Sequence, residues 1–113
     1  MTGRERDEPD ETVDAFAEAV NMTAGRLEAW LTTDESRAVG QSDGGGESVG
    51  HASGRRIVTL LRTKKADLTA ADLAHMRKVV GYVQRHGAQR PAGDVTETPW
   101  RYSLMNWGHD PLG

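Results

Sequence analysis

The chain contains no cysteine among its 113 residues. This absence excludes disulfide bonds and thiolate metal sites together, and it is typical of a reducing compartment. Long apolar runs are also absent, because no segment approaches the roughly 18 apolar residues of a membrane-spanning helix, and the opening residues MTGRERDEPDE are mostly charged. We therefore expect a cytoplasmic protein that does not contact a membrane.

Apolar and aromatic side chains are scarce. Only 36% of the residues are hydrophobic and 5% are aromatic, so a chain of this length has enough apolar surface for one modest core and not for two. Trp100, Tyr102 and Trp107 supply three of the six aromatic side chains. A domain this poor in large apolar groups needs them in its core, and we expect this C-terminal segment to dock there.

Alternating strand patterns of useful length are missing, whereas helical periodicity recurs along the chain. After a disordered lead of residues 1–10, residues 11–113 are expected to form one small all-α domain of five or six helices. Helices are expected over residues 11–21, from Thr23 through Leu31, from Thr33 to Gly40, from Ser53 to before Lys64, from Thr69 to Gly87 and from Thr98 to Gly108. The four threonines among these positions are the expected N-caps, and Asp72 completes a capping box with Thr69.

Six glycines lie between positions 40 and 54. Their backbone entropy disfavours a helix, so this Gly-rich loop is expected to be irregular and flexible. Residues 45–52, GGESVGHA, have the glycine spacing of a P-loop, but His51 and Ala52 replace the required lysine and hydroxyl residue. No strand precedes them either, so nucleotide triphosphate hydrolysis of the P-loop type is excluded.

Catalytic and metal-binding patterns are weak. None of the four histidines pairs with another at the i, i+4 spacing of a helical zinc site. Two arrangements stay open without a motif behind them: Glu47, His51 and His75 meeting in space, and Ser48 or Ser53 beside a histidine. A third hypothesis is an enzyme built around Glu47, Ser48 and His51 on the Gly-rich loop. The sequence predicts no catalytic residue, no metal and no cofactor.

The net charge of −3 conceals a strong asymmetry. Residues 1–50 carry a net charge of −8, residues 51–90 carry +7, and residues 91–113 carry −2. Two interpretations are open: the basic block forms one positive surface for an anionic partner, or the acidic N-terminal half neutralises it.

The basic block is expected to form a central hairpin of two basic helices. Its first residues, Ser53 to Arg56, are expected to open a helix whose free N–H groups attract an anion; alternatively, Gly50 and Gly54 provide only a turn and a close helix contact. The leading hypothesis is binding of nucleic acid, above all double-stranded DNA, through phosphates and with low sequence specificity. The residues predicted to carry it are Ser53, Gly54, Arg55, Arg56, Arg62, Lys64, Lys65, Arg77, Lys78 and Arg85.

A second hypothesis makes the chain a protein-interaction or stress-associated module without nucleic acid. The basic hairpin then binds an acidic partner or a second copy of the same chain, which would give a homo-oligomer.

Four segments resemble one known family: VNMTAGRLEAWL, GGGESVGHASGRRIV, ADLAHMRKVVGYVQRHGAQRP and WRYSLMNWGHDPLG. They are similar to small bacterial, haloarchaeal and fungal proteins grouped as domain-of-unknown-function family 3140, some of which carry a DNA-binding label. The resemblance runs from about Val13 to the C-terminus. It implies a shared domain design that includes the glycines and the aromatic tail, and it supplies no catalytic residue.

Overall fold

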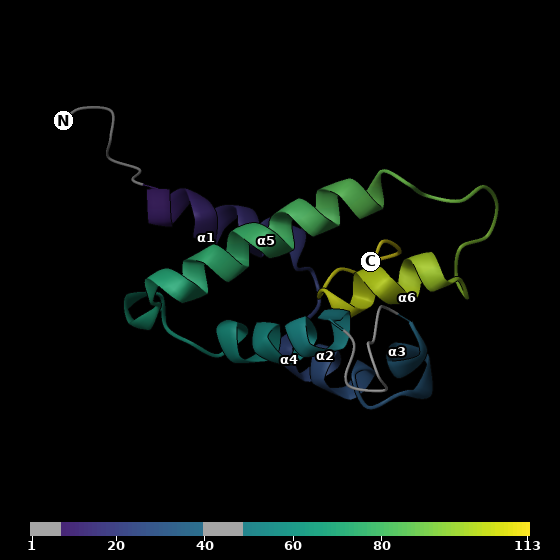
Figure 1. Ribbon diagram of the computed structural model, residues 1–113, viewed down its shortest axis with the longest axis horizontal. Helices are drawn as coiled ribbons and strands as arrows, with labels where there is room; N and C mark the ends of the chain where they lie inside the picture. Colours follow the sequence, from purple (N-terminus) through teal and green to yellow (C-terminus); the bar gives the residue numbers. More distant parts are fainter. Residues whose placement is uncertain (1–7, 40–48) are drawn as a thin grey trace.

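The computed structural model of the chain describes residues 8–39 and 49–113. Within these ranges every regular element is helical, which confirms the all-α fold class (Figure 1). The elements are α1 (Glu8–Ala19), α2 (Ala24–Trp30), α3 (Asp34–Ala38), α4 (Val49–Leu61), the 3-10 turn η2 (Lys65–Asp67), α5 (Ala70–Gly87) and α6 (Pro99–Asn106). None of these helices combines the length and the apolar character needed to cross a membrane.

Four helices begin at the threonine N-caps that the sequence predicts. The side chains of Thr23, Thr33 and Thr98 each accept a hydrogen bond from the backbone N–H three residues later. Thr69 and Asp72 form the full capping box, with bonds of 3.1 and 3.0 Å between each side chain and the other's backbone N–H. These caps satisfy donors that a first helical turn otherwise leaves unpaired.

Two helix starts differ from the predictions. Helix α1 begins at Glu8, so the last three residues of the predicted disordered lead are helical; residues 1–7 lie outside the described ranges. Pro9 is tolerated there because the first N–H groups of a helix have no intrahelical acceptor.

Helix α4 begins at Val49, four residues earlier than predicted, and it contains Gly50 and Gly54. The prediction of irregular structure is wrong for this end of the Gly-rich loop, because both glycines are buried against α6 and the packing offsets their entropic cost. The rest of the loop, residues 40–48, is outside the described ranges.

The helices pack in two pairs with α6 between them. Helix α5 packs mainly on α1, and α4 packs mainly on α2. In Figure 1, α4 and α5 approach each other at the η2 end and spread apart toward the opposite end, where α6 contacts both. The expected central hairpin is therefore a splayed V and not a closely packed pair.

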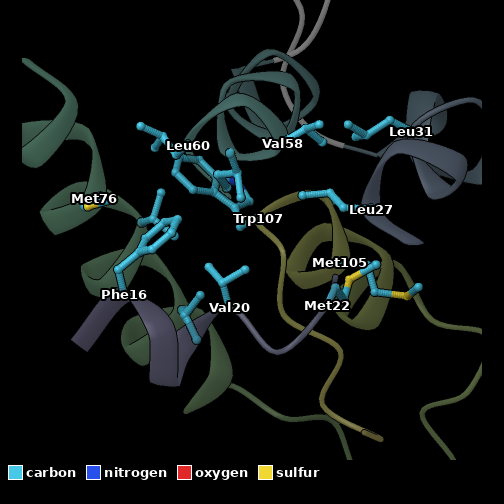
Figure 2. Packing of buried hydrophobic residues seen from close by; sticks show 13 residues of the cluster. Phe16, Val20, Met22, Leu27, Leu31, Val58, Leu60, Met76, Met105 and Trp107 are labelled. Carbon is cyan, nitrogen blue, oxygen red and sulfur yellow. The ribbon is translucent and has the colours of Figure 1, made fainter. Parts of the chain in front are cut away.

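Trp107, at the C-terminal end of α6, lies among the apolar side chains of both helix pairs. It is 5% exposed and belongs to one cluster with Phe16 of α1, Leu27 of α2, Ile57 of α4 and other buried residues. Figure 2 shows its indole near the middle of the labelled side chains. The expected docking of the aromatic tail on the core is confirmed, with Trp100 buried in a second, smaller cluster.

The chain turns sharply after α6 and returns to the α1–α2 connection. Gly108 adopts a positive φ of 82°, and a Cβ at this position would lie 2.9 Å from a methyl group of Val20. The tail then pairs with the connection: Met22 N–H donates to the Gly108 carbonyl, and the Asp110 N–H donates to the Asn21 side chain. Glycine is required at this turn both for its conformation and for the close approach.

Asp110 holds this C-terminal tail in place through ion pairs. Its carboxylate is 1% exposed and is bound by Arg26 of α2 and by Arg101 of α6, the latter through two nitrogens at 3.0 and 3.1 Å. Burial acts to raise the pKa of Asp110, but hydrogen bonds from Arg101, the Leu112 N–H and Arg26 outweigh it and lower the pKa from 3.8 to about 2. The ionised form is therefore strongly favoured in the folded protein.

Acid is expected to remove about 2 kcal/mol of stability through Asp110 alone. Because the folded pKa lies below the unfolded value, this contribution is complete above pH ~4 and is lost as the pH falls toward ~2. Urea unfolding across that range should show wild type losing about 2 kcal/mol more than Asp110→Asn, whereas Asp67→Asn, an exposed control, should follow wild type. An Asp110→Asn protein with the pH dependence of wild type would contradict the assignment.

Candidate anion-binding groove

Two adjoining hollows lie between α4, α5 and the end of α6, and Val49, Lys78 and Trp107 line both of them. We call them together the α4/α5 groove. One hollow has a volume of about 340 Å³ and the other about 360 Å³. The remaining lining residues of the first are Gly50, Tyr82, Arg85, Ser103 and Asn106, and those of the second are Ala52, Ser53, Arg56 and His75.

The floor of the groove is a stack of rings. The Trp107 indole lies 4.3 Å from the Tyr82 ring at an interplanar angle of 13°, and 6.3 Å from the His75 ring at 11°. Because Trp107 is only 5% exposed, its faces have no room for an incoming base. The floor is mainly aromatic, so it offers few hydrogen-bonding groups for reading a base sequence.

Cationic side chains form the rim. Arg56 comes from α4, and Lys78 and Arg85 come from α5. Arg56 pairs with Asp72 at 3.1 Å, whereas neither Lys78 nor Arg85 has an acidic partner in the part of the chain that the structure describes. The Arg85 guanidinium folds back over Gly81, where a Cβ would approach it to 2.9 Å. The groove therefore combines an apolar floor with an excess of positive charge.

A buried serine and a histidine meet at one end of the groove. Ser53 Oγ lies 2.9 Å from His75 Nε2, and Ser53 is only 4% exposed. Burial lowers the pKa of His75 below 6.5; nearby Arg56 and Lys78 lower it further, and Asp72 opposes them. His75 is therefore mainly neutral at pH 7.

Comparison with protein families gives one result. A family model described as "Protein of unknown function (DUF3140)" matches residues 15–105. The chain belongs to this family. The match includes α2 to α5 entirely, and it confirms the resemblance over the first three sequence segments and over residues 100–105 of the fourth. No curated protein and no solved structure matches the chain.

The DUF3140 description names no enzymatic activity. The Ser53–His75 pair is one of the arrangements left open by the sequence, but among residues 8–39 and 49–113 no carboxylate hydrogen-bonds to His75. The arrangements that use Glu47 or Ser48 lie partly outside these ranges, which omit both residues. His51, the described member of these arrangements on the loop side, has its Nε2 2.7 Å from the Leu31 carbonyl. No cluster of metal ligands is found in the described part of the DUF3140 chain.

The helix start predicted at Ser53 is wrong for this DUF3140 protein, so the free N–H groups expected to attract an anion there are not those of Ser53 to Arg56. Only the first four N–H groups of a helix lack an intrahelical acceptor, and because α4 begins at Val49, Ser53 supplies the fifth. Gly54 is buried, and a Cβ there would lie 2.5 Å from the Asn106 carbonyl and 2.7 Å from Leu31. The alternative of a close helix contact is correct for Gly54.

The other predicted basic residues lie on different surfaces. Arg62 pairs with Glu28 at 3.1 Å, Lys65 pairs with Asp10, and Arg77 donates to Thr12 Oγ1 at 3.3 Å. The ion pairs of Arg62 and Lys65 show that acidic residues of the N-terminal half neutralise part of the basic block. This was the second of the two interpretations of the charge asymmetry.

Arg55 and Lys64 are also separate from the groove. Arg55 lines another hollow of about 400 Å³ together with Arg62 and with Arg37 of α3. Lys64 is exposed in the connection between α4 and η2. Of the ten predicted site residues, the groove brings together Ser53, Arg56, Lys78 and Arg85.

Sequence reasoning missed the contribution of Tyr82 and Trp107 to this site, and it named His75 only in a grouping with Glu47 and His51. The i, i+7 spacing of His75 and Tyr82 puts both on one side of α5, which is a usable signal. Nothing in the sequence indicates that Trp107 lies between them, because that contact joins distant parts of the chain.

Proposed function

We propose that this protein binds nucleic acid through backbone phosphates, with low sequence specificity, and that the α4/α5 groove is the principal contact surface. The observation that carries the proposal is that Lys78 and Arg85, without acidic partners among the described residues, border one groove together with Arg56. Phosphate contacts dominate the affinity of proteins that bind nucleic acid without reading bases.

The spacing of the cations suits a polyanion. Lys78 and Arg85 are seven residues apart on α5, which corresponds to about 10 Å along the helix axis. A DNA strand carries one charge for about every 3.4 Å of duplex axis, so the two side chains are able to reach different phosphates of one strand. Arg56 adds a third contact from α4.

The number of contacts sets the expected salt dependence. For double-stranded DNA, three phosphate contacts give a slope of about −3 when the logarithm of the association constant is plotted against the logarithm of the salt concentration. Eight contacts, one for each predicted cation, would give a slope of about −7. A salt series on a short duplex therefore tests both the function and the size of the site.

Removing the two cations without acidic partners should strongly weaken DNA binding. We expect Lys78→Ala/Arg85→Ala to lower the affinity for a short duplex on the order of 50-fold at ~0.1 M salt and to reduce the slope to about −1. The control is Arg55→Ala/Arg62→Ala, which removes the same charge from the other hollow and should retain most of the affinity. Equal losses in both double variants, or no binding by wild type at low salt, would refute the proposal.

Protein binding is the second candidate, favoured by an exposed apolar residue at the groove. Val49 is 58% exposed beside the apolar floor, and Glu11 and Glu18 give α1 an exposed acidic face that a second copy would offer to the basic rim. Light scattering at several concentrations separates the two functions. A strict monomer that binds DNA supports the first, and a dimer that the Lys78→Ala/Arg85→Ala change dissociates supports the second.

A further inference from the structure

We propose that the end of the groove formed by Ser53, Arg56, His75 and Lys78 is a subsite for one phosphate group, and that the phosphate binds together with a proton on His75. The inference rests on the proposed function, because the phosphate is taken to be one of the nucleic-acid backbone. It adds a specific location and a dependence on pH.

The geometry provides donors from two helices around one hollow. Ser53 and Arg56 come from α4, His75 and Lys78 come from α5, and all four line the same volume of about 360 Å³. Guanidinium, ammonium and hydroxyl groups are the side chains that proteins use to hold phosphate oxygens.

The charge of this hollow depends on His75. Among the described residues, the charged groups that act on His75 are Arg56 from α4 and Asp72 and Lys78 from α5. Trp107, which directly follows α6, stacks near His75 and is uncharged. The pair of Arg56 with Asp72 runs through Nη2 and leaves other guanidinium N–H groups for a phosphate. The formal charges of Arg56, Asp72 and Lys78 sum to about one positive charge. A proton on His75 would double that charge.

The hydrogen bond between Ser53 and His75 supplies the coupling. When His75 is neutral and Nε2 carries a lone pair, the Ser53 hydroxyl donates its only hydrogen to it across 2.9 Å. When Nε2 is protonated, it donates to Ser53 Oγ instead, and the hydroxyl hydrogen becomes available to a phosphate oxygen. One proton taken from solvent therefore adds a charge to the site and releases a donor.

Electrostatics favours the same coupling. Burial lowers the pKa of His75 in the free protein, and Arg56 and Lys78 lower it further. An anion between these cations offsets their repulsion of the imidazolium, so the pKa of His75 should rise in the complex. By linkage, affinity then increases as the pH falls toward the pKa of the free protein.

The test uses sulfate first, because it keeps its double charge across the relevant pH range. NMR titration of the histidine rings in wild type should show the pKa of His75 rising by about one unit in saturating sulfate. His109, which lines neither the groove nor the other cationic hollow, is an internal control in the same spectra and should not respond to sulfate. Because this measurement needs no variant, it does not depend on a substituted chain folding.

A short DNA duplex then replaces sulfate. Wild type should bind it about tenfold more tightly at ~pH 5 than at ~pH 8, which is the equivalent of one pKa unit, and His75→Asn should lose most of this difference. A sulfate-induced change at His75 no larger than that at His109 would overturn the inference. A pH dependence of DNA affinity in His75→Asn equal to that of wild type would also overturn the inference. If DNA still bound with the expected salt slope, the proposed function would nevertheless stand. Conversely, a sulfate-dependent pKa at His75 in a protein that does not bind DNA would refute that function and support the subsite.

Discussion

Asn106→Ala is expected to lower the free energy of unfolding by about 3 to 4 kcal/mol, the largest effect anticipated for a single substitution here. Asn106 is 1% exposed and joins α6 to two other helices. Its Oδ1 accepts from Trp30 Nε1 at 2.7 Å and from Ser36 Oγ at 2.6 Å, and its Nδ2 donates to the Ser36 carbonyl at 3.0 Å.

The loss is large because alanine leaves the partners without their bonds. Ser36 is fully buried, so its hydroxyl and carbonyl cannot turn to water, and each buried polar group left unsatisfied costs about 1 to 3 kcal/mol. Urea unfolding gives the change in free energy, and Gln89→Ala, an exposed amide in the α5–α6 loop, serves as the control.

A double-mutant cycle identifies the bond involved. Ser36→Ala should destabilise less than Asn106→Ala, and the two changes together should cost less than their sum, because both remove the same Ser36–Asn106 interaction. Additive effects, or an Asn106→Ala protein within about 0.5 kcal/mol of wild type, would show that Asn106 is not a junction of the fold.

Gly54→Ala is expected to destabilise the protein by about 3 kcal/mol, at the upper end of the range for overpacking. A Cβ at this position would lie 2.5 Å from the Asn106 carbonyl oxygen. That oxygen belongs to the backbone and cannot swing aside as a side chain does, so α4 and the end of α6 must separate. The helical preference of alanine over glycine offsets at most about 1 kcal/mol of this strain.

Gly25→Ala is the matched control for this substitution. Gly25 also lies in a helix, but no atom is within 4 Å of a Cβ placed there, so alanine should stabilise the protein by about 0.5 to 1 kcal/mol. Opposite signs for the two substitutions in the same unfolding assay are the expected result. Stabilisation by both would mean that α4 and α6 do not approach as closely as the structure shows.

These two positions also determine the shape of the groove. Asn106 and Trp107 line it from the α6 end, and Gly54 sets how closely α6 approaches α4. Variants at either position should weaken anion binding together with stability. The Lys78 and Arg85 variants should instead weaken binding with little effect on stability, because both side chains are exposed.

The sequence by itself determined what depends on near neighbours in the chain. Local hydrogen bonding and side-chain periodicity account for the threonine caps, for the capping box at Thr69 and for the end of α6 near Gly108. They also account for the helical character of every regular element in residues 8–39 and 49–113. The burial of Trp100 and Trp107 also followed, because a chain with six aromatic side chains has few other groups for its core.

Only the tertiary structure decided the start of α4 and the content of the groove. Local propensity argues against a helix through Gly50 and Gly54, and contact with α6, about fifty residues later in the chain, reverses that preference. The pairing of Lys65 with Asp10 and of Arg62 with Glu28 likewise depends on which helix faces meet. Such contacts leave no periodic signal in the sequence. The sequence therefore supplied the charges and the fold class, whereas tertiary packing determined which cations face one groove.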